Sequence, residues 1–235
     1  MNAILQTLKD SVLHLFFPHI CAGCGNDILT PQSQLCAKCI HKLPFTGFEN
    51  HSPNPIEKNL SGRVRFQKAT SQLYFNKESL VQRLMHQFKY RGNINLGRQL
   101  GVIMGTQLIE SRRFNNIDFL VPLPLYENKL KQRGFNQSKV LCEGISEIMN
   151  IGIIEDAIER PLFTETQTKK NRVERWQNIE GKFNAKKSNK IEGRHVLLID
   201  DVITTGATIE SCASTLLNIK GVTLSIATLC CAINN

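Results

Sequence analysis

The sequence predicts an α/β protein: a mostly parallel β-sheet flanked by helices, with a small cysteine-containing module before it. Two observations predict this fold class. From about residue 66, short apolar runs alternate with longer segments of helical periodicity. Before that point, four of the eight cysteines stand in two closely spaced pairs. A chain of 235 residues is long enough to bury a sizeable core.

Each predicted element has its own signal. Strands are predicted at residues 69–75, 118–124, 195–200 and 222–230, and helices at 78–90, 94–112, 136–149 and 205–220. Residues 47–65 are rich in Pro, Asn, Ser and Gly, which is typical of a connector. We therefore predict an N-terminal module at 1–46, a connector at 47–65 and the α/β domain at 66–235.

The N-terminus predicts an amphipathic helix rather than a targeting or membrane segment. Ile4, Leu8 and Val12 recur at helical spacing, whereas Lys9 and Asp10 interrupt the apolar run. No apolar run approaches the roughly 18 residues that a transmembrane helix needs. We therefore expect a cytoplasmic protein with no transmembrane segment.

The paired cysteines predict a metal site. Cys21 and Cys24 form one CxxC pair, Cys36 and Cys39 the other, and such pairs each grip one side of a tetrahedral zinc ion. Two disulfides in a secreted domain are the alternative, which the absence of a signal peptide disfavours. Four cysteine ligands leave no open position for water, so the predicted zinc is structural.

The stretch "HVLLIDDVITTGAT" predicts a ligand site after a buried strand. Asp200 and Asp201 would lie at the carboxyl end of that strand, and like charges there need a partner rich in hydroxyls or a cation. The threonines offer no countercharge, so we expect that partner to come from outside the chain. A solvated turn is the alternative.

The residues that follow the aspartates predict a phosphate cradle. A helix N-terminus presents unpaired N–H groups, and hydroxyls beside it add donors. The cradle is formed by Thr204, Thr205, Gly206, Ala207 and Thr208. A ribose 5-phosphate would place its phosphate there and its diol near the acids, either directly or through hydrated Mg²⁺.

This stretch resembles the phosphoribosyl pyrophosphate (PRPP) motif of type I phosphoribosyltransferases. Residues 84–101, 121–138 and 164–183 further resemble the ComF competence family, which also has a four-cysteine zinc module before a phosphoribosyltransferase-like domain. The resemblance implies PRPP binding, use of Mg²⁺ with it, and a role in natural DNA uptake, with single-stranded DNA and competence-machinery proteins as partners.

Basic residues supply further candidates. The loop after the strand at 118–124 would face the pyrophosphate end of the ligand, through Lys129, Lys131, Arg133 and Gly134. A solvated basic loop is the alternative there. Two other groups would reach phosphate or nucleic acid, or be solvated: Lys89 and Arg91 in one, and Lys169, Lys170, Arg172 and Arg175 in the other.

Catalysis is not settled by these patterns. Thr204 occupies the position where some purine-salvage relatives have a catalytic carboxylate, so no base is evident there. Three functions stay open: a competence-associated binding protein, an active phosphoribosyltransferase of unknown acceptor, and a PRPP-responsive regulator. The net charge of +9 favours a polyanionic partner. Aromatic residues near basic ones are candidates for stacking on bases: Phe66, Tyr74, Phe88, Tyr90 and Phe135.

Overall fold

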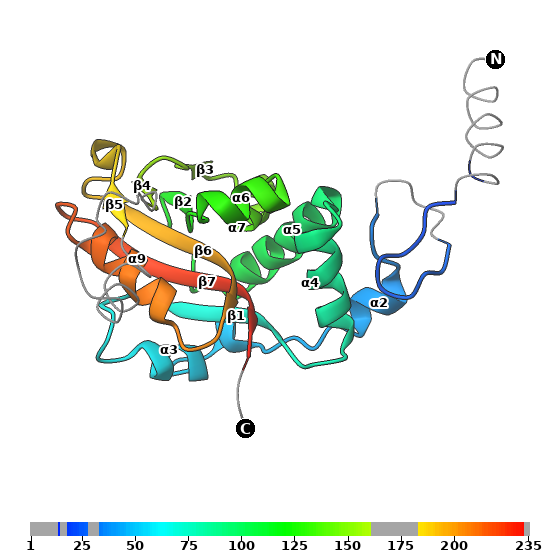
Figure 1. Cartoon of the computed structure of the whole chain (residues 1–235). Coiled ribbons are helices and arrows are strands. Elements are labelled where there is room, and N and C mark those ends of the chain that lie inside the picture. Colours follow the sequence, from blue (N-terminus) through cyan, green and yellow to red (C-terminus); the bar gives the residue numbers. More distant parts are fainter. Residues whose placement is uncertain (1–13, 15–17, 28–32, 161–182, 233–235) are drawn as a thin grey trace, which may run out of the picture.

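The fold is built on a five-stranded parallel sheet (Figure 1). The computed structural model describes residues 14, 18–27, 33–160 and 183–232. The strand order is β1-β7-β6-β2-β3, with β1 at Ala69–Tyr74, β7 at Thr223–Cys231, β6 at His195–Ile203, β2 at Phe119–Pro122 and β3 at Gly152–Ile153. A separate antiparallel pair is formed by β4 (Ile158–Glu159) and β5 (Asn184–Ala185). The predicted fold class is confirmed.

Helices cover both faces of the sheet (Figure 1). One face packs against α4 (Leu80–Tyr90), α5 (Ile94–Glu110) and α7 (Gln137–Met149), and the other against α3 (Pro55–Leu60) and α9 (Ala207–Leu217). β6 contributes to both cores, because Leu197 and Ile199 face the first group of helices while Val196 and Leu198 face the second. A strand buried on both faces explains why this segment is a continuous apolar run.

Glycines bring α5 and α7 close together. A Cβ on Gly101 would lie 2.4 Å from the carbonyl oxygen of Leu141, and one on Gly144 would lie 2.2 Å from that of Arg98. Side chains at these positions would force the helices apart. The two helices therefore form a tightly packed pair over the sheet, which fixes the N-terminus of α7 at the sheet's carboxyl edge.

The segment predicted as a connector contains η1 (Phe48–Asn50) and α3. Asn54 caps α3 through hydrogen bonds from the backbone N–H groups of Ile56 and Glu57, and the Glu57 side chain completes a capping box. Ile56 and Leu60 are buried in the core beside α9. Arg113 fastens the segment by donating to the Glu57 carboxylate at 2.8 Å and to the backbone carbonyl of His51. Within the predicted connector, Asn54 and Pro55 therefore start a helix.

The N-terminal module packs against α4 and α5. It contains α2 (Ala37–His41), and its residues Cys21, Leu35 and Cys39 are buried in the same core as those two helices. The side chain of Gln87 on α4 donates to the carbonyl of Ala22 at 2.7 Å, and Gln99 on α5 accepts from the backbone N–H of Gln34 at 2.7 Å. The module is therefore joined to the helices that flank the sheet.

Most of the predicted N-terminal helix lies outside the described residues. Among the residues that are described, no helix is both long enough and apolar enough to cross a membrane.

Candidate functional site

The predicted site lies between β2 and β6, where the order in which the chain adds strands to the sheet reverses. From β2 the chain continues outward to β3, whereas from β6 it continues to β7 on the other side. Parallel sheets of this kind bind ligands beyond the carboxyl ends of the strands that flank such a point. β6 runs through both aspartates and ends at Ile203, three residues beyond the predicted end.

The threonine loop joins β6 to the N-terminus of α9. Gly206 is the N-cap and has φ of 79°, a conformation that favours glycine, and a Cβ there would lie 2.9 Å from Leu60 Cδ2. The hydroxyl of Thr205 accepts a hydrogen bond from the N–H of Ala207 at 3.4 Å. A cavity of about 40 Å³ is lined by Asp200 and residues 202–209. The structure thus brings Asp200 and the whole predicted cradle to one cavity.

Arg63 holds this loop from the side of α3. Its guanidinium donates to the carbonyl of Thr205 at 2.7 Å and to the carboxylate of Glu210 on α9 at 2.6 Å. The same group contacts Asn59 Oδ1 at 3.3 Å. A residue predicted to belong to a connector therefore fixes both sides of the α9 N-terminus.

Each aspartate has a partner within the chain. The ammonium of Lys89, in the last turn of α4, lies 2.8 Å from Asp201 Oδ2. The hydroxyl of Ser138, at the start of α7, donates to Asp200 Oδ1 at 3.2 Å, and so does the backbone N–H of Asp201 at 2.8 Å. The expectation that the countercharge comes only from outside the chain is wrong, because Lys89 provides one.

The two carboxyl groups differ in their electrostatics. Burial and, after it, the charge of the neighbouring Asp201 raise the pKa of Asp200 to about 7. Lys89 and Ser138 oppose that rise without cancelling it. Near neutral pH, Asp200 therefore gains and loses a proton readily, whereas Asp201 is paired with a cation.

The candidates for the pyrophosphate side fall on a helix rather than a loop. Lys129, Lys131 and Arg133 belong to α6 (Glu127–Arg133), and Gly134 ends it with φ of 79°. Lys131 pairs with Glu127 at 2.8 Å, while Arg133 donates to Gln137 at 2.6 Å. Of the four, only Gly134 lines the adjoining cavity of about 780 Å³, which begins at the end of β2. The arrangement brings Gly134 to that cavity and leaves Lys129 exposed.

The other basic and aromatic candidates differ in their exposure. Lys169, Lys170, Arg172 and Arg175 lie outside the described residues. Phe88 is fully buried and so has no free face for a base, whereas Tyr90 is 58% exposed. Tyr90 also stacks with the guanidinium of Arg133, whose Cζ lies 5.5 Å from the ring centroid.

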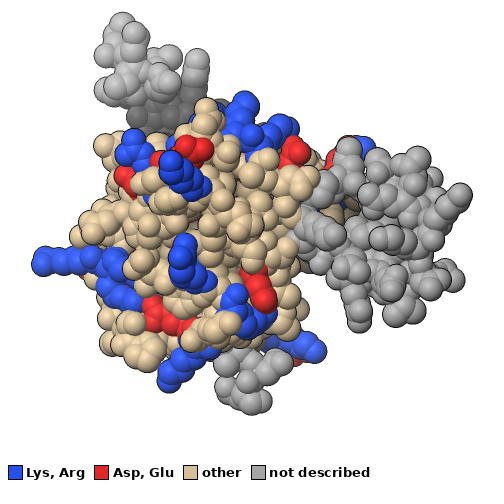
Figure 2. Space-filling view, turned by 90° about the vertical axis from the view of Figure 1, so that its left-hand side faces the viewer, with Lys and Arg blue, Asp and Glu red and all other residues tan. Residues whose placement is uncertain are grey.

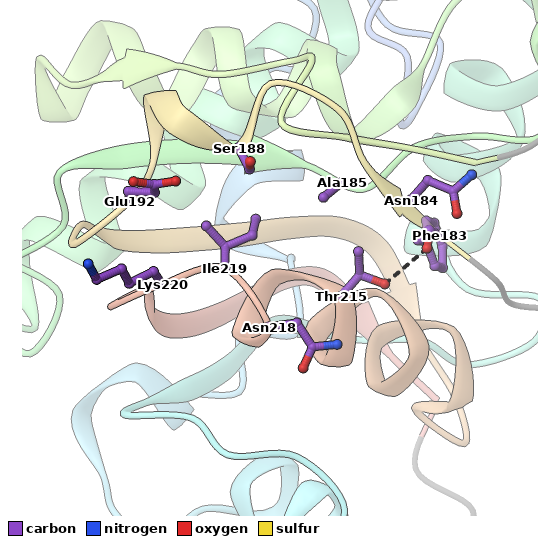
Figure 3. Close-up of a pocket in the computed structure, with 9 residues that line it drawn as sticks. All are labelled: Phe183, Asn184, Ala185, Ser188, Glu192, Thr215, Asn218, Ile219 and Lys220. Carbon is purple, nitrogen blue, oxygen red and sulfur yellow. Dashed lines mark hydrogen bonds between the residues drawn. The ribbon is translucent and has the colours of Figure 1, made fainter.

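A further cavity lies away from these residues. It has a volume of about 560 Å³ and is bounded by the residues around β5 and η3 (Ser188–Lys190) and by the C-terminal half of α9 (Figure 3). Thr215 Oγ1 donates to the carbonyl of Phe183 at 3.2 Å across it. The predicted cradle lies at the opposite end of α9, so no predicted site residue is among the described residues that line this cavity.

The four predicted metal ligands come together. The Sγ atoms of Cys21, Cys24, Cys36 and Cys39 all lie within 4.8 Å of one another. Cys24 Sγ and Cys36 Sγ are 3.8 Å apart, and a regular zinc–sulfur tetrahedron with bonds of about 2.3 Å has edges of about 3.8 Å. None of the four is in a disulfide. The cluster is therefore close enough to hold a metal such as zinc.

The thiols of this cluster titrate unequally. Burial acts to raise the pKa of Cys21, but backbone N–H groups, first that of Cys36, outweigh it and lower the pKa to about 6. Burial and the neighbouring thiols raise the pKa of Cys39 to about 12. Because four thiolates at this spacing repel one another, a bound cation is what allows all four to deprotonate. The donor set fits zinc.

Sequence reasoning missed two contributors to the acidic site and left a third undecided. Ser138 was recognised only as part of a helix start, and Arg63 gave no signal at all. Lys89 was considered as either a phosphate contact or a solvated residue, because its partner lies more than a hundred positions away. The spacing of the chain offers no clue to such pairings.

Comparison with known proteins agrees with this architecture. The phosphoribosyl transferase domain family matches residues 154–234. The DNA utilization protein YhgH of Escherichia coli O157:H7 is 29% identical over 215 residues, covering 90% of this chain and 89% of that protein. Competence protein F of Haemophilus influenzae is 24% identical over 207 residues, covering 83% and 89%. Competence protein ComFC of Bacillus subtilis is 32% identical over 151 residues, covering 63% and 58%.

The first two of these relatives align with more than four fifths of the chain. The chain is thus similar along most of its length to proteins named for competence and DNA utilization, and its C-terminal part matches the phosphoribosyl transferase domain family.

Proposed function

We propose that this protein binds a ribose 5-phosphate group, as in PRPP, at the carboxyl end of β6. The observation that carries the proposal is the adjacency of the cradle to the acidic pair: Asp200 lines the same small cavity as Thr204–Thr208. The phosphate would take the N–H groups at the start of α9, where the helix dipole favours an anion. The ribose hydroxyls would donate to the carboxylates.

Divalent metal fits the acidic pair poorly. Asp201 already holds the ammonium of Lys89 at 2.8 Å, and Asp200 Oδ1 already accepts two hydrogen bonds. Mg²⁺ needs six oxygen ligands in a near-ideal octahedron. Any Mg²⁺ that accompanies PRPP is therefore expected on the pyrophosphate of the ligand and not on these side chains.

Binding, rather than transfer, is the function we favour. Transfer of the phosphoribosyl group usually needs a base near the acceptor, and Thr204 is an exposed hydroxyl at the position where some relatives have a carboxylate. The ligand would then act as a signal or an anchor within the competence role. The alternative, an active phosphoribosyltransferase, requires a base from another segment.

We also propose that the cysteine cluster holds a structural zinc ion. All four ligands are cysteines and the cluster packs into the core beside α4 and α5, with Cys21 and Cys39 buried. A closed set of four sulfur ligands leaves no position for a substrate. The role of the ion would be to hold the module against these helices.

Single-stranded DNA is a second proposed partner, favoured by one specific observation. Tyr90 is the exposed aromatic among the five candidates, and Arg133 stacks on it. Bases stack on such pairs at a gain of about 1–3 kcal/mol each. On the face viewed in Figure 2, Lys and Arg are scattered rather than gathered in one stripe, so the described part of that face gives no track for a strand. The named competence relatives make DNA-handling proteins further candidate partners.

The test of the main proposal is the thermal shift that PRPP or ribose 5-phosphate causes. We expect the double variant Asp200→Ala with Asp201→Ala to lose the shift, while Asp156→Ala keeps it. Asp156 is a matched control because its carboxylate pairs with Lys187 at 2.6 Å on the surface, outside the cavity. A shift of unchanged size in the double variant would refute the site. Pyrophosphate release from PRPP across a panel of nucleobases and amines separates transfer from binding.

The DNA proposal has its own test. Affinity for a single-stranded oligonucleotide should fall steeply with salt concentration, and Tyr90→Ala should weaken it by about tenfold or more. As a control, Ile109→Ala removes an exposed apolar side chain near the C-terminus of α5, away from Tyr90 on α4, and should have no effect on DNA affinity. An affinity that is independent of salt, or equal in the two variants, would contradict a stacking site at Tyr90.

A further inference from the structure

Lys89 occupies the position at the acidic pair where a metal ion would be expected. Its ammonium lies 2.8 Å from Asp201 Oδ2, and the two side chains are only 17% and 14% exposed. A surface ion pair of this type would be a minor feature. Here the pair is largely removed from solvent and belongs to the site that we propose for ribose phosphate.

The position of Lys89 is fixed by its neighbours on α4. Phe88 is fully buried, and its ring lies 2.1 Å from where a Cβ on Gly97 would be. The same ring packs on Phe135, with centroids 5.7 Å apart. Gln87 is tied to the carbonyl of Ala22. The last turn of α4 is therefore held from two sides, and the ammonium is placed without needing a ligand.

An ammonium and a magnesium ion make different demands on the same carboxylates. Mg²⁺ would take carboxylate oxygens as ligands and keep several waters. An ammonium carries one charge and three N–H donors. Lys89 can therefore stay on Asp201 and still donate to a ligand oxygen, whereas a second cation beside it would be repelled.

We propose that Lys89 takes the place of a divalent cation at the acidic pair, so that the site binds ribose 5-phosphate without metal. The inference rests on the proposed function, but it concerns a different property: which cation neutralises Asp200 and Asp201. It makes Lys89 a specificity-determining residue. The site would favour a sugar phosphate whose hydroxyls meet the carboxylates directly, over one that reaches them through Mg²⁺.

The first test uses Mn²⁺ alone, with the zinc-loaded full chain. Electron paramagnetic resonance of free Mn²⁺ should show no site at the acidic pair in the wild type. Lys89→Met should gain a site that binds Mn²⁺ about tenfold or more tightly than any in the wild type, and adding Asp201→Asn should remove it. Lys89→Arg keeps the charge and should exclude Mn²⁺ as the wild type does, which controls for altered folding. A wild-type Mn²⁺ site that Asp201→Asn abolishes would overturn the proposal.

The second test uses ribose 5-phosphate, because this ligand has no pyrophosphate of its own to bind metal. The wild-type affinity should be the same in EDTA and in excess MgCl₂. Lys89→Met should bind weakly in EDTA and regain about tenfold on addition of MgCl₂. If the wild type depends on MgCl₂ as strongly as the variant does, Lys89 does not replace the metal. If neither protein binds ribose 5-phosphate, the proposed function fails, and the Mn²⁺ result still decides the role of Lys89.

Discussion

The cysteine cluster and the acidic site are built in opposite ways. All four cysteines come from residues 21–39, and their sulfurs meet because two short turns face each other. The acidic site joins distant parts of the chain: Asp200 and Asp201 on β6, Lys89 on α4, Ser138 on α7 and Arg63 after α3. The sequence motif of the first site contains all four of its predicted ligands. The motif of the second site contains the two aspartates and lacks Lys89, Ser138 and Arg63.

The difference shows what a local motif can specify. A metal supplies the energy that gathers its ligands, so residue type and spacing are sufficient. The partners of a carboxylate pair on a strand, in contrast, depend on which helices pack against that part of the sheet. The two sites are also connected, because Gln87 contacts the N-terminal module two positions before Lys89 reaches Asp201.

The largest effect is expected from removing metal ligands. The double variant Cys21→Ser with Cys36→Ser should lose its zinc and lower the midpoint of thermal unfolding by roughly 10 °C or more, because metal binding and folding are coupled. Ribose 5-phosphate affinity should fall as well, since the module helps to hold α4. Zinc content by mass spectrometry and calorimetry are the measurements.

Cys142→Ala is the matched control for that comparison. Cys142 is fully buried on α7, outside the cluster. Its loss should reduce stability by about 1–2 kcal/mol while leaving one zinc ion per chain. An unchanged zinc content in the double serine variant would show that the four cysteines are not the ligands.

A smaller effect, with a sign that depends on pH, is expected at Asp200. Its pKa is raised from 3.8 to about 7 by burial, so the folded protein binds a proton that the unfolded chain releases. Stability is therefore lost as the pH rises from about 4 to about 7, and the loss is complete above that range. Asp200→Asn removes the cost and should stabilise the protein by roughly 2–3 kcal/mol at pH 8, and by less at pH 5.

Asp201→Asn is expected to act in the opposite direction. It would leave the Lys89 ammonium, which is 17% exposed, without its partner. Unfolding in urea at pH 8 should show Asp200→Asn as more stable than the wild type and Asp201→Asn as less stable. Two variants with the same sign would mean that the carboxylates share one environment, which would contradict the division between them.

The fold of the α/β domain was largely predictable from the sequence, whereas the helix within residues 47–65 was not. The predicted strands and helices of the α/β domain correspond to β1, β2, β6, β7 and α4, α5, α7, α9, because apolar periodicity reports directly which side is buried. Residues 47–65, which the sequence predicts as a connector, contain η1 and α3. Asn54 and Pro55 are frequent in loops, but here they start a helix whose Leu60 is fully buried.

The site was predictable only to the extent of its motif. Asp200 and the threonine loop line one cavity, because strand, acids and helix start are consecutive in the chain. The basic residues of α6 were expected in a loop at the ligand. Instead, a helix forms there and Lys131 pairs within it, as an i,i+4 neighbour of Glu127. The local spacing of residues does not predict contacts that depend on how helices pack together.

The smallest effect is expected at Arg63, and it distinguishes positioning of the loop from general stability. Arg63 and Glu210 are 35% and 39% exposed, so Arg63→Ala should cost less than about 1 kcal/mol of stability. Ribose 5-phosphate affinity should nevertheless fall by about three- to tenfold, because the carbonyl of Thr205 loses its donor and the α9 N-terminus is free to shift. Arg98→Ala breaks a comparable ion pair with Glu143 on the other face, at 2.9 Å, and should leave affinity unchanged. Arg63→Lys should recover only part of the affinity, since one ammonium cannot reproduce a guanidinium that bridges Thr205 and Glu210. Equal affinities in all three variants, measured by calorimetry, would mean that the loop holds its shape without help from α3, and that the acidic site is more local than the contacts around it indicate.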